Sequence, residues 1–364
     1  MKVHGFLQGV RVIDLSQYIP GPFASRQLAD LGAEVIKIEP PAGDPMRHFM
    51  HQSSDTMSPV YRHLNRGKKI CRTDLKSEDG KERLRKLLTG ADILLESYRP
   101  GVLQRLGFDR ATLDELNPTL IHCALSGYGQ NGPYRLRAGH DINYCAGSSI
   151  LALNGSESQP MMSYPLLADH AGAMQASTMM LAALHGRHHQ TGSTYIDISM
   201  LETCLSWQYL PILTSQNERA GDIVNGGAAC YNIYRSSEGL FLSLGAIETA
   251  FWKNFCTAVE HPEWIARQFE TMPQGALIAE LEVLFAEHKL EHWNTLLDSV
   301  DCCYQPLYFP EQLARHPQLM SRGAISNNGP RHPAWVNQQA IDIEEAVFEI
   351  DAGKLNWLPS AAAE

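Results

Sequence analysis

An apolar strand, a helix and a second apolar strand follow one another near the start of the chain, and this order constrains the fold more than any other feature. The strands are predicted at residues 11–15 (RVIDL) and 34–39 (EVIKIE). Between them Pro20-Gly21-Pro22 predicts a turn, residues 23–31 have helical spacing, and Gly32 ends the helix. Strands joined through a helix lie parallel in one sheet, so the pattern predicts an α/β fold with a parallel, doubly wound sheet.

The same alternation continues as far as residue 199. The predicted elements are a helix at 78–88, a strand at 92–96, a helix at 111–116, a strand at 120–125, a helix at 171–185 and a strand at 194–199. The helix at 171–185 is rich in Ala, Met and Leu on nearly all faces, which is typical of a helix in the interior.

The rest of the chain has a different pattern. Residues 206–229 resemble a linker, with scattered polar residues and several glycines. Strands at 231–234 and 240–244 flank the turn Ser237-Glu238-Gly239 and predict a hairpin. Helices are predicted after the hairpin, so we expect a smaller α+β domain over residues 230–310.

Composition excludes several classes of protein. The 364 residues carry 30 Lys and Arg against 40 Asp and Glu, and an acidic chain without a sustained basic run is not expected to bind nucleic acid. The longest apolar stretch, residues 165–184, contains Asp169, His170 and Gln175, so no membrane span is predicted. The start lacks the features of a signal peptide, and the eight cysteines include no CxxC pair. We therefore expect a cytoplasmic protein with reduced thiols.

Three ionisable residues are candidates for chemistry. Asp169 directly precedes the apolar helix, where it is either an N-cap or a carboxylate held for acid–base or nucleophilic work. His140 is followed by Asp141, which is expected either to cap the next helix or to fix the imidazole ring. Glu248 ends an apolar strand and opens a helix, so by itself it is also a candidate cap.

Basic residues and a glycine-rich turn are candidates for ligand binding. The cations cluster at Arg62, Arg66, Lys68, Lys69 and Arg72, and again at Arg99 and Arg105. They form either a solvated face or a pocket for a phosphate-bearing ligand. The turn at residues 126–133 follows a predicted strand, where parallel sheets place ligands, or it is a plain tight turn. The GxGxxG, HExxH and GxSxG motifs are absent, so neither a nicotinamide cofactor nor a metal is indicated.

Together, these features resemble the family III CoA-transferases (CaiB/BaiF), which include the α-methylacyl-CoA racemases. The matching stretches are GVRVIDL at 9–15, PGP at 20–22, LADLGAEVIKIE at 28–39, NRGKK at 65–69, TDLK at 73–76, YRPGV at 98–102, GYGQ at 127–130 and DISM at 197–200. The resemblance covers nearly the whole chain.

The resemblance implies an architecture and a ligand. A large Rossmann-like domain would be made from residues 1–205 and a return segment at 311–364, with the small domain inserted between them. Two subunits would interlock as a homodimer. The substrate would be an acyl-CoA, with coenzyme A as part of the substrate and no covalently bound cofactor. The residues that the resemblance implies for CoA binding are Ile19, Pro20, Lys37, Arg66, Arg99, Gly101, Gly127, Tyr128 and Gly129.

The resemblance also implies catalytic roles. In the transferases an Asp at the position of Asp169 is a nucleophile that carries the acyl group and then CoA as an aspartyl thioester. In the racemases this Asp is one of two acid/bases, and the second is the His of a Gly-His-Asp-Ile-Asn-Tyr motif. That motif is intact here at residues 139–144, and the racemases' Gly-Ala-Ile-Glu is intact at 245–248. Glu248 would then orient or charge His140.

The motifs favour racemase chemistry over CoA transfer. Residues 301–306 (DCCYQP) resemble a racemase segment, whereas a Gln and a run of glycines found in formyl-CoA transferase-like enzymes are missing. Inversion of the carbon next to a thioester needs two acid/bases on opposite faces, and His140 and Asp169 match those roles. Oriented N–H donors must stabilise the enolate, and we expect them at the N-terminus of the helix that follows Asp169. We therefore predict a 2-methylacyl-CoA racemase or epimerase, with a family III CoA-transferase as the alternative.

Overall fold

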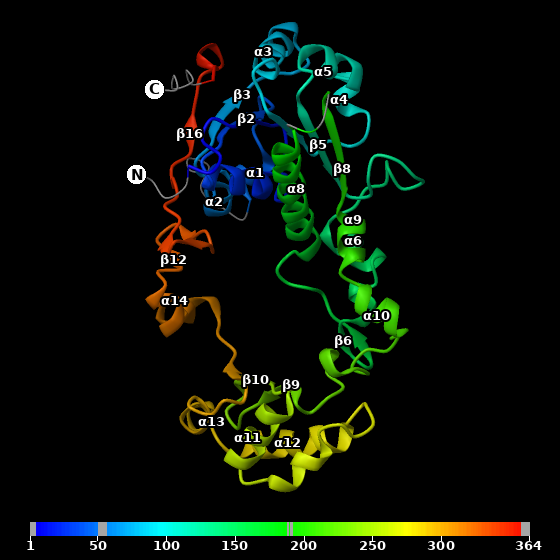
Figure 1. Ribbon diagram of the computed structural model, residues 1–364, viewed down its shortest axis with the longest axis vertical. Helices are drawn as coiled ribbons and strands as arrows, with labels where there is room; N and C mark the ends of the chain where they lie inside the picture. The colour runs from blue at the N-terminus through cyan, green and yellow to red at the C-terminus, as the bar shows by residue number, and fades with distance from the viewer. Residues whose placement is uncertain (1–4, 50–56, 188, 190–191, 358–364) are drawn as a thin grey trace. The chain divides into compact units, whose positions relative to one another are not determined.

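The chain divides into two compact units. The computed structural model describes residues 5–49, 57–187, 189 and 192–357. The large unit comprises Met1–Gly147, Pro165–Ser206 and Pro317–Glu364, and the small unit comprises Ser148–Tyr164 and Trp207–His316. Figure 1 labels the elements of each unit. The small unit includes Ser148–Tyr164, which the sequence analysis placed in the large domain.

A seven-stranded sheet forms the centre of the large unit. Its order is β16-β3-β2-β1-β4-β5-β8, and every neighbouring pair is parallel. The strands are β1 Arg11–Asp14, β2 Glu34–Glu39, β3 Lys69–Arg72, β4 Ile93–Glu96, β5 Ile121–Ser126, β8 Thr194–Ser199 and β16 Phe348–Glu349. The predicted parallel α/β sheet is confirmed. The strand order reverses at β1, which pairs with β2 on one side and β4 on the other, so the loops after β1 and β4 flank the usual ligand crevice.

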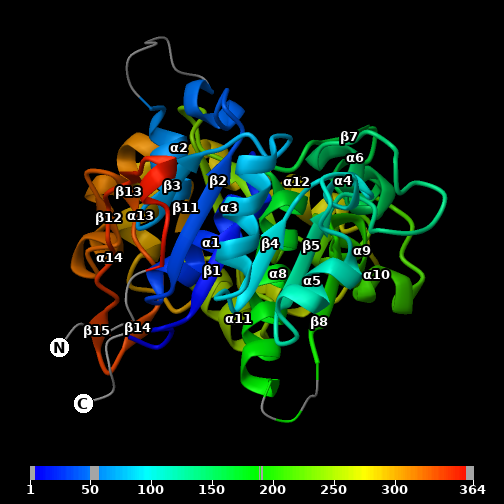
Figure 2. The ribbon, with the colours of Figure 1, turned by 90° about the horizontal axis from the view of Figure 1, so that it is seen from above.

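Helices cover both faces of this sheet (Figure 2). The helices of the large unit are α1 Pro20–Asp30, α2 Pro59–Asn65, α3 Glu78–Leu88, α4 Val102–Arg105, α5 Arg110–Leu116, α6 Asp141–Gly147, α8 Leu167–Gly186, α9 Met200–Ser206 and, in the return segment, α14 Pro317–Ser321. Leu84 of α3 and Leu113 of α5 share one apolar cluster with Ile13 and Leu94 of the sheet. On the other face, α1 packs against α8, where the Ser177 hydroxyl donates to the Ala24 carbonyl oxygen.

Two helices begin earlier than the sequence analysis predicts. Helix α1 starts at Pro20, within the expected turn, because proline is favoured in the first turn, where its missing N–H has no intrahelical acceptor. Helix α8 starts at Leu167, with Leu166 as its N-cap, so Asp169 is the third residue of the helix and not its cap. The Asp169 carboxyl therefore lies in the first turn of α8.

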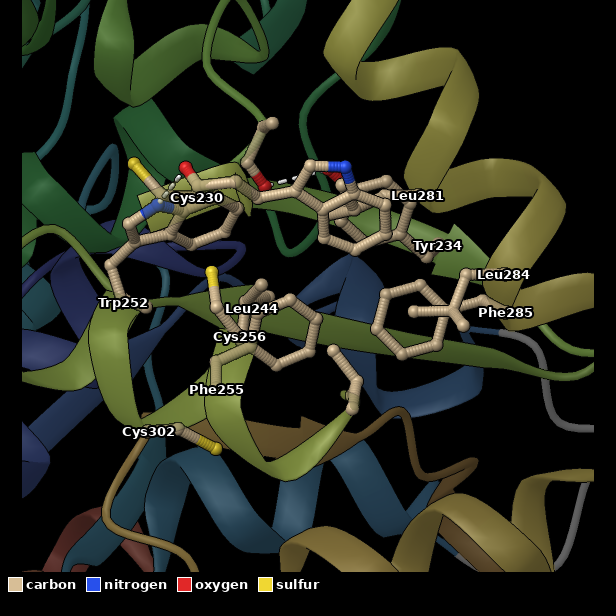
Figure 3. Packing of buried hydrophobic residues seen from close by; sticks show 14 of the residues in the cluster. Cys230, Tyr234, Leu244, Trp252, Phe255, Cys256, Leu281, Leu284, Phe285 and Cys302 are labelled. Atoms are coloured by element: carbon tan, nitrogen blue, oxygen red, sulfur yellow. Dashed lines mark hydrogen bonds between the residues drawn. The ribbon is translucent and has the colours of Figure 1, made fainter. Parts of the chain in front are cut away.

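The small unit contains an antiparallel sheet of order β11-β10-β9, and the predicted hairpin forms β9 and β10. The elements are α7 Ile150–Leu153, β6 Gly155–Ser156, β7 Gln159–Pro160, α10 Tyr209–Thr214, β9 Tyr231–Arg235, β10 Phe241–Gly245, α11 Thr249–Ala258, α12 Gly275–Glu287, α13 Leu290–Leu297 and β11 Tyr304–Pro306. Its core is aromatic: Trp252, Phe255 and Phe285 are fully buried together (Figure 3), and the Trp252 indole N–H donates to the Trp264 carbonyl oxygen at 2.9 Å. Within the described ranges, no helix is long and apolar enough to cross a membrane.

Candidate active site

Asp169 lies where α8 meets α6. Its backbone N–H donates to Asp141 Oδ1 at 3.0 Å, and Asp141 is the first residue of α6. The Asp169 side chain is half-buried. Burial, and to a smaller extent the nearby Asp141 charge, raises the pKa of Asp169 to about 7. A carboxyl group with this pKa can both accept and donate a proton near neutral pH.

The motif at residues 139–144 forms the turn that starts α6. The His140 backbone N–H donates to Asn143 Oδ1 at 3.0 Å, and the Tyr144 hydroxyl donates to the Gly139 carbonyl oxygen at 2.7 Å. These bonds fix the backbone on both sides of His140, whose side chain is exposed. Because Asp141 follows His140 and contacts Asp169, the structure brings the chain segment of His140 to the first turn of α8.

The glycine-rich loop after β5 packs against this turn. A Cβ atom on Gly127 would lie 2.3 Å from the Tyr144 hydroxyl oxygen, so only glycine allows the approach. The Tyr128 ring meets the Tyr144 ring edge-on at 5.1 Å, and Gly129 has a φ of +82°. Burial raises the pKa of Tyr144 to about 12, with further contributions from Tyr128 and Asp169, so its hydroxyl remains a donor. The glycine-rich loop thus packs against α6, and α6 packs against α8.

Replacing Gly127 by Ala is expected to destabilise the large unit by about 1–3 kcal/mol, because the buried Tyr144 ring must move and its bond to Gly139 is strained. Urea unfolding measures the effect. Gly275 is the matched control, since its Cβ would meet nothing within 4 Å. Equal stability of the two alanine variants would contradict the packing described here.

Four further predicted CoA-binding residues lie at the loops after β1 and β4. Ile19 is the N-cap residue of α1, and Pro20 is its first residue. Gly101 has a φ of +82° and begins α4. Arg99 is exposed, and its charge lowers the pKa of Tyr144, against the raising effect of burial. These residues therefore flank the crevice at the point where the strand order reverses.

Two predicted CoA-binding cations are instead used inside the fold. Lys37 is fully buried; its Nζ donates to the Ser16 carbonyl oxygen at 2.6 Å and pairs with Asp44 at 3.0 Å. Arg66 is also buried, and its guanidinium pairs with Asp30 at 2.8 Å. A buried charge needs such partners. Asp44 lies seven residues after Lys37, and Asp30 lies 36 residues before Arg66. The prediction that Lys37 and Arg66 hold CoA is therefore revised.

Glu248 belongs to the small unit. It occupies the N-cap position of α11, but its side chain makes no capping hydrogen bond and is exposed. Its carboxylate is therefore not used to begin the helix. The interpretation of Glu248 as a simple cap is not supported.

The sequence analysis missed the contact of Asp141 with Asp169. The sequence shows only that an Asp follows His140. The two roles expected for Asp141, a helix cap and a partner of the His140 ring, both involve its neighbours in the chain. The bond to Asp169 spans 28 positions and depends on the packing of α6 against α8.

Comparison with known proteins places the chain in a family. The family model described as CoA-transferase family III matches residues 7–352. Alpha-methylacyl-CoA racemase of Mus musculus is 32% identical over 336 residues, which are 90% of this chain and 84% of the relative. Succinyl-CoA:glutarate CoA-transferase of Homo sapiens is 29% identical over 331 residues, 88% of this chain and 75% of the relative.

A solved structure agrees with this assignment. The crystal structure of a CaiB/BaiF family protein from Brucella suis is 25% identical, with a TM-score of 0.80 over 93% of this chain and 94% of that chain. The chain belongs to CoA-transferase family III and is an enzyme of that family.

Proposed function

We propose that this enzyme is a 2-methylacyl-CoA racemase or epimerase that moves a proton between the two faces of the α-carbon. The observation that carries the proposal is the Asp169 carboxyl, whose pKa is raised to about 7 at the junction with the His140 segment. A general acid/base works best with a pKa near the working pH. Burial and the Asp141 charge keep a share of the Asp169 carboxyl protonated at neutral pH. This suits a group that must both take and give a proton, whereas a nucleophile of the transferase kind works only when it is ionised.

In the proposed mechanism, Asp169 and His140 stand on opposite faces of the α-carbon. One takes the α-proton as a base, and the electron pair of the broken C–H bond moves to the thioester oxygen as an enolate. The other then donates its proton to the opposite face, and the electron pair returns to carbon. Backbone N–H groups would donate to the enolate oxygen. The Asp169 N–H already donates to Asp141, whereas the N–H groups of Leu167 and Ala168, in the same first turn, have no intrahelical acceptor and would take this role.

The coenzyme A portion of the substrate is assigned to the crevice flanked by the loops after β1 and β4. Ile19, Pro20, Arg99 and Gly101 would line it, and the loop at 127–129 would separate it from Asp169. The exposed Arg99 guanidinium supplies a charge for the phosphates.

A homodimer forms part of the proposal. Helix α10 has no buried residue, and its apolar side chains Tyr209, Ile212 and Leu213 are 64%, 58% and 80% exposed. A second copy of the chain would cover this helix, and the exposed His140 needs a cover that excludes water. We also propose that Glu248 orients His140. A further part of the proposal is that the enzyme works in the cytoplasm, where thiols stay reduced.

The His140→Ala variant separates the two reactions. It is expected to lower racemisation of a 2-methylacyl-CoA by about a hundredfold or more, because one of the two acid/bases is lost. Epimerisation and CoA transfer to a free carboxylic acid are measured in parallel for wild type and variant. Transfer activity in the wild type that survives in the variant, without racemisation in either, would favour the CoA-transferase alternative.

A further inference from the structure

A cavity lies on the side of the central sheet that faces away from α8 and Asp169. Its volume is about 460 Å³, and its lining comes from β4, β5, β8, α4 and the start of α5, which lie together in Figure 2. Side chains alternate along β5, and Leu125 lies against Gly172 of α8. His122, three residues before Leu125, therefore faces the opposite side and lines the cavity. The sheet separates this cavity from the proposed acid/base.

The cavity contains buried polar groups that lack partners. His122 is 7% exposed and Glu96 is 5% exposed. Among the residues that the structure describes, neither ring nitrogen of His122 has a hydrogen-bond partner, and the same holds for the side-chain amide nitrogen of Gln130. The Tyr98 N–H donates to Glu96 Oε2 at 2.7 Å, whereas Glu96 Oε1 lies 3.8 Å from His122 Nε2, too far for a hydrogen bond. Buried polar groups are normally paired, so these groups point to a ligand.

Two carboxylates flank a small residue on this face of the sheet. In the strand register, Ala124 lies opposite Glu96 of β4 on one side and opposite Asp197 of β8 on the other. Because neighbouring strands lie only about 5 Å apart, the short alanine leaves space between the two carboxylates. Burial raises the pKa of Tyr195 to about 12, with further rises from Asp197 and Glu96, so both negative charges act on the wall of the cavity.

The positive charge nearby is already neutralised. Arg110 is the only Lys or Arg among the lining residues, all of which the structure describes. Its guanidinium pairs with Asp114 at 2.9 Å and donates to the Ser193 carbonyl oxygen at 3.1 Å. Within the described part of the chain, Glu96 forms no ion pair with a Lys or Arg. The cavity therefore has an excess of negative charge and of hydrogen-bond acceptors.

We propose that this cavity is a binding site for a small organic cation that carries a primary ammonium group. One nitrogen atom can lie within hydrogen-bond distance of both Glu96 Oε1 and His122 Nε2, because these atoms are 3.8 Å apart. Its N–H groups donate to the carboxylate and to the neutral imidazole, which accepts at one nitrogen. Leu103 and Phe108 supply an apolar wall for the carbon chain of the ligand. The excess negative charge disfavours the phosphates of CoA, so this site is additional to the proposed CoA crevice.

Binding of n-butylammonium tests the site, with the His122 ring as the reporter. The ring signals are followed by proton–nitrogen NMR at neutral pH and constant ionic strength, and are assigned with His122→Gln. We expect saturable shifts with a Kd on the order of 1 mM, which suits a ligand of a few heavy atoms. The neutral 1-butanol has the same carbon chain and is expected to bind about tenfold more weakly or worse. Shifts that do not saturate, or that 1-butanol produces equally, would overturn the proposal.

The Glu96→Gln variant removes the charge and keeps an oxygen that accepts the Tyr98 N–H. Its affinity for n-butylammonium is expected to fall about tenfold or more, because a charge-assisted hydrogen bond becomes a neutral one. Glu115→Gln is the matched control, since Glu115 is exposed on α5 and lies outside the lining. Unchanged affinity in Glu96→Gln would contradict the role of this carboxylate.

Two further measurements separate binding from folding and from the proposed reaction. Glu96→Gln is expected to leave the midpoint of urea unfolding unchanged or higher, because a buried charge without a counterion is removed. A clear fall in the midpoint would assign Glu96 to the fold and overturn its role as a ligand-binding group. His140→Ala is expected to bind n-butylammonium as tightly as the wild type, whether or not the enzyme proves to be a racemase. Weaker binding by His140→Ala would place the cation in the active site instead.

Discussion

Replacing Asp169 by Asn is expected to lower kcat for racemisation about a thousandfold or more, equivalent to about 4 kcal/mol of lost transition-state stabilisation. The amide has nearly the same shape as the carboxyl group, but it cannot take up or release the proton. Because the Asp169 N–H belongs to the backbone, its bond to Asp141 is retained. The loss should therefore appear in kcat and not in the affinity for CoA.

The control for this variant is Asp109→Asn, which changes a carboxylate at the start of α5, outside the proposed site. Its kcat should match that of the wild type. Wild-type racemisation by Asp169→Asn would show that another group moves the proton, and the site described here would then be wrong.

Replacing Arg66 by Met is expected to destabilise the protein by about 3–5 kcal/mol, because Asp30 would lose its closest cation inside the fold. Arg66 also donates to the Pro330 carbonyl oxygen at 3.1 Å, so the variant loosens the C-terminal segment from α2. Urea unfolding measures the loss. Lys86→Met is the matched control: Lys86 is exposed and lies 3.9 Å from Glu82, so the change should be below about 1 kcal/mol.

The same variant tests the revised role of Arg66. If Arg66 only supports the fold, the folded Arg66→Met protein binds CoA as tightly as the wild type. A large fall in CoA affinity without a fall in stability would restore the original prediction that Arg66 contacts the phosphates.

The parallel sheet could be predicted because its signals are local. Apolar runs such as residues 34–39, followed or preceded by helical spacing, lie within one stretch of chain and need no distant partner. The start of α1 was placed three residues late because Pro20 was interpreted as part of a turn, although proline also favours the first turn of a helix.

The site was predicted less completely because its contacts are long-range. Arg66 belongs to a basic cluster in the sequence, and the family resemblance implies that Lys37 binds CoA. Only the folded chain shows that Asp30 and Asp44 neutralise these two cations. The bond between Asp141 and the Asp169 N–H likewise exists only once α6 packs against α8. Sequence patterns identify candidate charges, whereas packing decides which of them face a ligand and which stabilise the interior.

The most direct test of the proposed function is exchange of the substrate α-proton in D₂O. The protein is incubated with (R)- or (S)-2-methylacyl-CoA, without any acceptor acid, and the α-proton is followed by NMR. The two-base mechanism predicts loss of the α-proton signal with formation of the opposite enantiomer, and no exchange with Asp169→Asn. Absence of exchange, together with a hydroxylamine-sensitive acyl or CoA label on Asp169 when an acyl-CoA and a free acid are supplied, would contradict the racemase proposal and establish CoA transfer.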